Sequence, residues 1–261
     1  MAKTHLAVLG SPIEHSKSPV IHAAAYEALG LDWDYGRYRI EANELEDFLR
    51  LRDDTWRGLS LTMPLKEIGY TLSTPSCPVA SATGIVNTLL HTESGWEGYN
   101  TDAFGLRQAV TRHSKHPFTK IAVLGSGATA NSAIYAMKDL FPNSEVFMFA
   151  RKSVSIHGVK AQPLETFYEL EDADLVISTL PGSVQHPVPL VSSKSVILDV
   201  AYSPWPSKLA QHWPEGNRIS GIEMLLWQAL VQVRIFTLGT GSEKLPNEDG
   251  IFAAMRAAVK A

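Results

Sequence analysis

Three polar side chains stand where short apolar or turn segments end, which are the places where strands of a sheet would end. Lys66 lies in GLSLTMPLKE, Asn87 in TGIVNTL and Asp102 in GYNTDAFG. An amine, an amide and a carboxylate offer hydrogen-bond donors and acceptors that suit a small polyhydroxylated acid. Upstream, GSPIEHSKSP adds the hydroxyls of Ser16 and Ser18. These residues predict a site for a small polar substrate.

A glycine-rich loop, GSGATA, lies between a β-branched run and an alanine-rich helical pattern. Gly125 permits a tight turn, and Gly127 lets the backbone approach a pyrophosphate at the helix N-terminus, where free N–H groups and the helix dipole favour an anion. A third glycine is missing, and for this motif alone the alternative is a glycine turn that binds nothing. The surrounding βαβ pattern favours a dinucleotide loop, so the chain is predicted to be an oxidoreductase.

Composition limits the class of protein. With 261 residues, 45% of them hydrophobic, the chain can bury the core of one large domain or two modest ones. The net charge of -4 comes from 23 basic and 27 acidic residues without long runs. The sequence therefore shows no basic cluster that would bind nucleic acid or an anionic membrane, and a soluble metabolic role is expected.

The single cysteine, Cys77, excludes an intramolecular disulfide framework and fits a reducing compartment. Nothing near it would lower its pKa, so a packing role is favoured over a nucleophile. The N-terminal apolar run is too short for a signal peptide, and no stretch approaches the roughly 20 apolar residues of a membrane span. We expect a cytoplasmic protein. The nine histidines show no HxxxH or comparable spacing, so no metal is expected.

Alternating strand and helix patterns predict a mostly parallel sheet covered by helices in the N-terminal part. Strands are expected at 6–10, 33–40 and 58–62, with helices at 19–30, from about Asn43 to Arg52, and from Pro64 onward. Asn43 followed by Glu46 fits a capping box, and Pro64 fits the first helical position.

A second unit is expected to begin near Asp102, with a helix through Val110. Strand patterns at 120–125, 145–150, 174–179 and 195–200, with a helix at 130–141, predict a Rossmann-like sheet. Only RKSVSIHG joins two apparent strands between Ala150 and Val159, which is too short for a usual crossover helix. Two final helices are expected at 222–238 and 247–260.

In this order, the segments closely resemble the NADP-dependent shikimate dehydrogenases of the shikimate/quinate dehydrogenase family. The resemblance runs from Gly10 to the terminal IFAAMRAAVKA and includes AYSPWPS at 201–207 and SGIEMLLWQALVQV at 220–233. It implies reduction of 3-dehydroshikimate to shikimate by NADPH in chorismate and aromatic amino-acid biosynthesis. It also implies an α/β substrate domain over 1–101, completed by about 222–261, and a Rossmann-like NADP-binding domain over 102–221.

The resemblance also assigns the substrate site. Lys66 would transfer the proton and Asp102 would orient it, Ser16 and Ser18 would bind the substrate carboxylate, and the remaining contacts would come from Thr62, Asn87, Tyr202 and Gln228. Ser60 stands where many members carry asparagine. The blander alternatives are a surface charge for Lys66, a helix N-cap for Ser18 before Pro19, and a core helix for MLLWQALVQV.

Cofactor choice is indicated after the second strand of the Rossmann-like sheet, in FMFARKS. An NAD enzyme would usually present an acidic residue there, whereas Arg151 suits the 2′-phosphate of NADP. The family pattern is asparagine, arginine, threonine, from which Ala150 departs, and a solvated basic turn is the alternative. The expected cofactor residues are Gly125, Ser126, Gly127, Ala128, Ala150, Arg151, Lys152, Ser153, Thr179, Gly221 and Met224.

Two rival functions remain, an NAD-dependent quinate/shikimate dehydrogenase and a catalytically idle NADP-binding sensor. The absence of an acidic residue after the second strand disfavours the first, and the retention of Lys66 with Asp102 disfavours the second. A homodimer is left open as the assembly.

Overall fold

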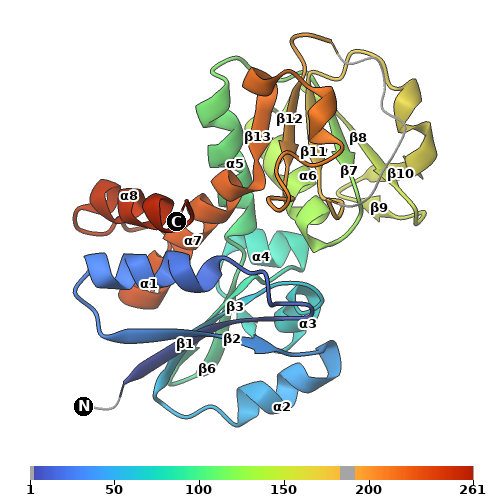
Figure 1. Ribbon diagram of the computed structural model, residues 1–261. Coiled ribbons are helices and arrows are strands. Elements are labelled where there is room, and N and C mark those ends of the chain that lie inside the picture. The colour runs from blue at the N-terminus through green and yellow to red at the C-terminus, as the bar shows by residue number, and fades with distance from the viewer. Residues whose placement is uncertain (1–2, 183–191, 261) are drawn as a thin grey trace. The chain divides into compact units, whose positions relative to one another are not determined.

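The computed structural model describes residues 3–182 and 192–260. The chain divides into two compact units (Figure 1). Unit 1 comprises Met1–Thr101 and Gln228–Ala261, and unit 2 comprises Asp102–Trp227. The division falls inside helix α7 (Gly221–Leu238), a few residues later than the expected return near residue 222, because α7 is one continuous helix.

In the described part of unit 1, six strands form a mixed sheet in the order β2-β1-β3-β5-β6-β4. The strands are β1 (Thr4–Gly10), β2 (Trp33–Arg39), β3 (Trp56–Leu61), β4 (Thr74–Pro75), β5 (Thr88–Thr92) and β6 (Gly95–Tyr99). Strands β2, β1 and β3 are parallel, whereas β5 pairs antiparallel with both β3 and β6. The parallel half confirms the βα pattern expected from the sequence.

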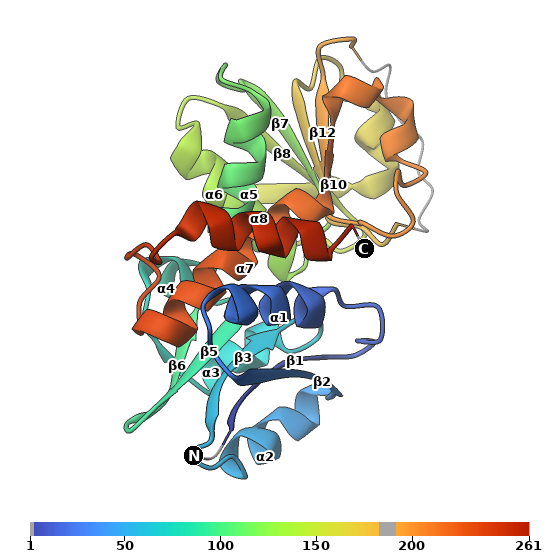
Figure 2. The same ribbon diagram turned by 60° about the vertical axis from the view of Figure 1, so that its left-hand side comes forward.

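The helices of unit 1 cover this sheet. They are α1 (Ser18–Ala28), η1 (Ala42–Glu44), α2 (Leu45–Arg50), α3 (Lys66–Thr71), α4 (Pro78–Thr83), the C-terminal part of α7, and α8 (Glu248–Ala258). Helix α8 lies beside α1 (Figure 1, Figure 2), so the end of the chain packs against its beginning. A buried aliphatic cluster that includes Leu9, Leu59 and Leu89 joins the strands to Leu45 and Leu49.

Two predicted helix starts were wrong, and the alternative N-cap role of Ser18 is not seen. The capping box is formed by Glu41 and Glu44, not by Asn43 and Glu46, so the chain enters this helix two residues earlier through a 3-10 turn. Helix α3 begins at Lys66 rather than at Pro64. The N-cap of α1 is Lys17, because Ser18 is already helical. The Lys17 side chain makes no capping hydrogen bond.

Unit 2 is a Rossmann-like sheet, as predicted. Its described strands are β7 (Lys120–Leu124), β8 (Glu145–Ala150), β9 (Ser155–Ile156), β10 (Val159–Pro163), β11 (Leu175–Ser178), β12 (Val196–Asp199) and β13 (Arg218–Ser220), in the order β13-β12-β11-β7-β8-β10-β9. All pair in parallel except the short β9. Counted from β7 and leaving out β9, this is the 3-2-1-4-5-6 order of dinucleotide-binding folds.

The connection from β8 to β10 contains no helix, as its length predicted. Instead β9 forms a small antiparallel hairpin with β10, and β10 then pairs in parallel with β8. The described helical segments of unit 2 are α5 (Asp102–His113), α6 (Ala128–Leu140), η2 (Leu164–Glu169), η3 (Ala210–His212), η4 (Glu215–Asn217) and the N-terminal part of α7.

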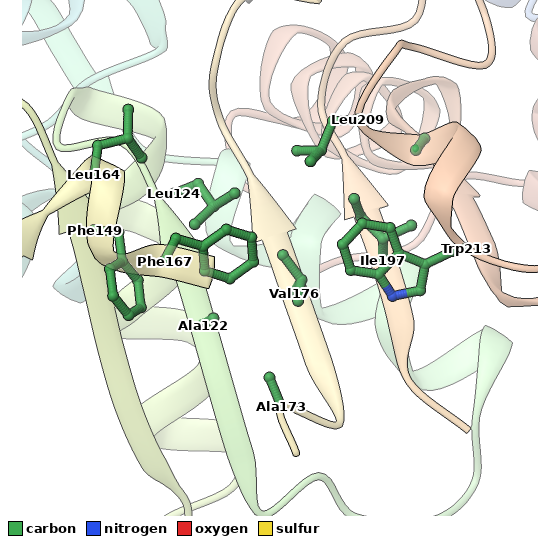
Figure 3. Packing of buried hydrophobic residues seen from close by; sticks show 11 residues of the cluster. Ala122, Leu124, Phe149, Leu164, Phe167, Ala173, Val176, Ile197, Leu209 and Trp213 are labelled. Carbon is green, nitrogen blue, oxygen red and sulfur yellow. The ribbon is translucent and has the colours of Figure 1, made fainter. Parts of the chain in front are cut away.

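One buried hydrophobic cluster of unit 2 lies on one face of the parallel strands. Figure 3 shows Leu124, Val176 and Ile197 from three neighbouring strands, packed with Phe167 of η2 and with Trp213. The indole Nε1 of Trp213 donates to Ser195 Oγ at 3.1 Å, so its buried polar atom is paired. Helices α5 and α6 contact each other within the same unit.

Among the described residues, α7 is long and apolar enough by length and composition to cross a membrane, contrary to the expectation that no stretch approaches such a span. Because 72% of this window is buried inside the protein, we interpret α7 as a core helix. Such a helix is weak evidence for a membrane.

Arg234 and Glu248 form a nearly buried ion pair between α7 and α8, with Nη2 and Oε1 2.6 Å apart. A second bond joins Arg234 Nε to Glu248 Oε2 at 2.6 Å, which makes the pair bidentate. Burial raises the pKa of Glu248, but Arg234 and the Leu245 N–H together hold that pKa below its usual value. The contribution of the pair to stability is therefore present at neutral pH and is lost as the pH falls through the lowered pKa.

Replacing Arg234 by methionine should lower the free energy of unfolding by about 3 kcal/mol, because the buried carboxylate loses its partner. Urea denaturation at neutral pH measures the loss. The double variant Arg234→Met/Glu248→Leu should recover part of it, since no uncompensated charge remains. Equal losses in the single and double variants would contradict this account.

Candidate active site

The end of β3 leads directly to two of the predicted substrate residues. The Thr62 N–H donates to the Leu9 carbonyl at 2.9 Å, and the Lys66 carbonyl accepts from the Val86 N–H at 2.9 Å. The second bond ties the first turn of α3 to the segment that precedes Asn87. Both side chains, of Thr62 and of Lys66, are half-buried.

Asn87 lies just before β5 and is only 2% exposed. Its Oδ1 accepts from the Thr101 backbone N–H at 2.9 Å and from the Thr88 hydroxyl at 2.8 Å. Its Nδ2 is 2.9 Å from Thr101 Oγ1 and 3.2 Å from Gln228 Oε1. Because a backbone N–H can only donate, the oxygen of this amide must face Thr101 N, and the orientation of Asn87 is fixed.

The predicted residues Asn87 and Gln228 are thus brought together, although they are far apart in the sequence. Thr101, which the sequence analysis missed, joins them, since its Oγ1 is also 3.3 Å from Gln228 Oε1. Asp102 follows it, is buried, and is the first residue of α5 and of unit 2. Lys66 belongs to unit 1. The orientation of Lys66 by Asp102 stays a prediction.

The two predicted carboxylate contacts lie at the start of α1. Ser16 Oγ accepts from the Ser18 N–H at 3.3 Å. Arg37 donates to the carbonyls of Glu14 and Ser16 at 2.6 and 2.8 Å and so holds this loop against β2. Ser18 is buried, and its hydroxyl interacts with the phenol of Tyr35. Arg37 was not expected from the sequence.

The glycine loop follows β7, as predicted. Gly125 has a φ of 111°, a conformation that L side chains rarely adopt, and a Cβ added there would collide with Thr179 Oγ1. The Thr179 hydroxyl donates to the Leu124 carbonyl at 2.8 Å, so the ends of β7 and β11 are tied together where the strand order reverses. Gly127 is the N-cap of α6, and a Cβ there would meet nothing within 4 Å.

Ser126 and Ala128 flank Gly127 and are partly exposed, and Ala128 is the first residue of α6. After β8, Arg151, Lys152 and Ser153 are exposed, whereas Ala150 is buried. Residues 151–153, the basic turn, therefore follow a strand that is the direct neighbour of β7, the strand that leads into the glycine loop. The open space at Gly127 and the cationic turn fit a phosphorylated dinucleotide.

Tyr202 is half-buried in the segment after β12. Asp199, another residue that sequence reasoning missed, holds this segment, since its carboxylate accepts from the Ala201 N–H at 3.1 Å and from the Ser207 hydroxyl. Burial raises the pKa of Asp199, and the Ser207 hydrogen bond opposes this rise. Gly221 and Met224 are buried at the start of α7, where a Cβ on Gly221 would collide with the backbone of Val200.

The sulfur of Cys77 caps α4, accepting from the Ala80 N–H at 3.4 Å, and it also accepts from the Asn100 N–H at 3.4 Å. Within residues 3–182 and 192–260, no group of three or more His, Cys, Asp or Glu side chains is placed to hold a metal ion.

Comparisons with known proteins settle the family. Residues 8–89 match the family described as "Shikimate dehydrogenase substrate binding domain". A shikimate dehydrogenase (NADP(+)) from one strain of Thermus thermophilus is 31% identical, over 97% of this chain and 98% of that protein. The chain belongs to the shikimate dehydrogenase family.

Solved structures of shikimate dehydrogenases have the same fold. That of Mycobacterium tuberculosis matches with a TM-score of 0.79 and 31% identity, covering 97% of this chain and 99% of the other. That of a second Thermus thermophilus strain, in complex with NADP(H) and shikimate, matches with a TM-score of 0.78 and 28% identity, covering 98% and 99%.

The two loop glycines should differ in their effect on stability. Gly125→Ala should lose about 1 to 3 kcal/mol in free energy of unfolding, because alanine is strained at positive φ and its methyl collides with Thr179. Gly127→Ala should stay within about 1 kcal/mol of the unmutated protein, since its φ of -85° suits any residue and the space is open. Urea denaturation compares them, and equal losses would refute the assignment of Gly125 to the turn.

Proposed function

We propose that this chain is an NADP-dependent shikimate dehydrogenase, which reduces 3-dehydroshikimate to shikimate in chorismate and aromatic amino-acid biosynthesis. The observation that carries the proposal is the likeness, over nearly the whole chain, to shikimate dehydrogenases named for NADP(+). It is supported by a solved relative of the same fold in complex with NADP(H) and shikimate.

The proposed substrate site uses hydroxyls for the carboxylate and amides for the ring hydroxyls. Ser16 and Ser18 would bind the carboxylate, and Ser18 must then turn its single proton from Tyr35 to the substrate. Thr62, Asn87, Asp102, Tyr202 and Gln228 would contact the hydroxyls and carbonyl of the ring. A buried amide of fixed orientation, such as Asn87, rejects a substrate that leaves it unpaired.

Lys66 is the proposed proton donor. Bound NADPH supplies the hydride to the C3 carbonyl carbon of the substrate. The carbonyl oxygen then takes one proton from the Lys66 ammonium, which leaves a neutral amine and an alcohol. In the oxidative direction the amine takes that proton back. Asp102, with its carboxylate, would orient the Lys66 amine.

Arg151 would set the cofactor preference. Its exposed guanidinium follows β8, the position from which Rossmann enzymes contact the adenosine ribose, and it can bind a 2′-phosphate with two hydrogen bonds. Lys152 and Ser153 follow it, and Ala150 replaces the asparagine expected there. Gly125 to Ala128 would hold the pyrophosphate, Gly221 and Met224 would lie near the nicotinamide, and Thr179 would be a further cofactor residue.

An assay of NADPH formation from shikimate and NADP+ tests the proposed function. Turnover supports it, whereas NADP+ binding without turnover would favour the idle sensor. An NAD-dependent quinate/shikimate dehydrogenase is disfavoured because an exposed arginine, not a carboxylate, follows β8. A cytoplasmic location is consistent with the single cysteine, and a homodimer stays a prediction.

Replacing Lys66 by alanine should lower turnover by about 100-fold or more, as is typical when a general acid is lost, and should leave NADP+ affinity nearly unchanged. Steady-state kinetics and a binding titration measure the two quantities. Lys3→Ala is the matched control, because Lys3 is an exposed lysine of the same unit. Near-normal turnover in Lys66→Ala would move the proton transfer to water or Tyr202.

Replacing Arg151 by alanine should raise the KM for NADP+ and leave the KM for NAD+ nearly unchanged, because only NADP+ carries the 2′-phosphate. The loss should be about 1.5 to 3 kcal/mol, the usual value for a hydrogen bond to a charged group. Lys160→Ala removes an exposed cation from β10 and serves as the control. If both cofactors weakened equally, Arg151 would not contact the 2′-phosphate.

A further inference from the structure

A buried chain of hydrogen bonds lies behind Asn87, and Gln232 is at its centre. Gln232 is 1% exposed and lies on α7 one helical turn after Gln228. Its Nε2 is 3.1 Å from the Asn87 backbone carbonyl and 2.8 Å from Thr88 Oγ1. Its Oε1 is 2.9 Å from Ser60 Oγ and 3.2 Å from His22 Nε2. All of these groups belong to unit 1.

The direction of each bond around Gln232 is determined. The Asn87 carbonyl can only accept, so the Gln232 nitrogen faces it, and the second hydrogen of that nitrogen goes to Thr88 Oγ1. The Thr88 hydroxyl, having accepted, gives its only proton to Asn87 Oδ1 at 2.8 Å. Gln232 therefore determines which way the Thr88 hydroxyl points, and Thr88 in turn holds the oxygen end of Asn87.

His22 supports the same orientation of the Gln232 amide, because it contacts the oxygen end of that amide. Burial lowers the pKa of His22 to about 3, opposed by the hydrogen bond to Gln232, so the ring is neutral and has one N–H. Because Gln232 Oε1 can only accept, the proton is on Nε2, and Nδ1 accepts from the Tyr26 hydroxyl at 3.1 Å. The His22 ring also stacks on Tyr35, with centroids 4.1 Å apart.

Ser60 continues the chain toward the proposed carboxylate site. The Tyr35 hydroxyl donates to Ser60 Oγ at 2.6 Å, and Ser60 then donates to Gln232 Oε1. Burial raises the pKa of Tyr35 far above its usual value, so this phenol stays protonated. Tyr35 also interacts with the Ser18 hydroxyl. One buried path therefore joins Ser18 to Asn87.

We propose that Gln232 is a positioning residue for the substrate: through Thr88 it holds the oxygen end of the Asn87 amide, whose orientation the Thr101 N–H determines, and through Ser60 and Tyr35 it couples Asn87 to Ser18. This inference rests on the proposed function, in which Asn87 and Ser18 contact a polyhydroxylated acid. Gln232 itself would not touch that acid. Ser60 stands in place of the asparagine common in the family. Its hydroxyl donates one of the two hydrogen bonds that Gln232 Oε1 accepts, and His22 donates the other.

Two substitutions test the positioning role. Gln232→Met keeps the length of the side chain but removes both donors, and Thr88→Val keeps the shape of Thr88 but removes the hydroxyl that holds Asn87. Both should raise the KM for shikimate on the order of 10-fold, the change expected when one neutral hydrogen bond is lost, and both should leave the KM for NADP+ within about 2-fold. Thr88→Ser restores the hydroxyl and should recover the unmutated KM.

Glu248→Gln is the matched control for stability. It weakens the nearly buried ion pair that joins α7 to α8, and it should lower the melting temperature without changing the KM for shikimate. If Gln232→Met and Thr88→Val melted earlier but kept the unmutated KM and kcat, the network would be merely structural and the proposal would be overturned. If Gln232→Met failed to fold, Thr88→Val and Thr88→Ser would still decide.

A readout without turnover separates this proposal from the proposed function. In the unmutated protein the side-chain NH₂ of Asn87 should give one NMR pair that exchanges slowly with water, and in Thr88→Val the exchange should become faster. An unmutated protein that failed to oxidise shikimate would refute the proposed function, and the amide would still report the positioning. Unchanged exchange in Thr88→Val would refute the positioning.

Discussion

The hydrogen bond from Gln232 Nε2 to the Asn87 carbonyl is the contact on which unit 1 depends. Both residues are almost entirely buried, and a buried polar group that loses its partner costs far more than a surface one. Because the bond joins α7 to the segment between α4 and β5, the C-terminal part of the chain must return to the N-terminal sheet for this amide to be satisfied. The same return brings Gln228 to Asn87.

Unit 2 follows a different constraint, which is local. The strand order reverses between β7 and β11, and there the chain needs a backbone that turns sharply and leaves space. Gly125 provides the turn through its positive φ, and Gly127 provides the space at the start of α6. A basic turn after the neighbouring strand β8 supplies the charge. The turn, the open space and the positive charge are each formed by a few consecutive residues.

This difference explains what the sequence could predict. The parallel strands of unit 2 and its glycine loop follow from local sequence pattern, and both are found in the structure. The short connection between Ala150 and Val159 predicted that no crossover helix would form there, and a hairpin takes its place. Helix starts were less predictable, because Glu41, rather than Asn43, lies where the backbone enters the helix. The alternative N-cap role of Ser18 is not seen either, because Lys17 takes that position.

The buried network could not be read from local pattern, since Ser60, His22 and Gln232 are partners only through the tertiary fold. One signal was available: Gln232 is a second glutamine one turn after Gln228 in a mostly apolar helix. A polar residue on the buried stripe of such a helix demands a partner. The role of Asp199, which binds the segment that contains Tyr202, could not be predicted from the sequence, because SVILDV is typical of any strand.

The central claim is that this chain oxidises shikimate with NADP+. The most direct measurement is a comparison of the specificity constants for shikimate and quinate, each with NADP+ and with NAD+. We expect kcat/KM to be highest by a wide margin for shikimate with NADP+, because Arg151 favours the 2′-phosphate and the buried amides favour one pattern of hydroxyls. Equal constants for the two cofactors, or a higher constant for quinate, would contradict this account.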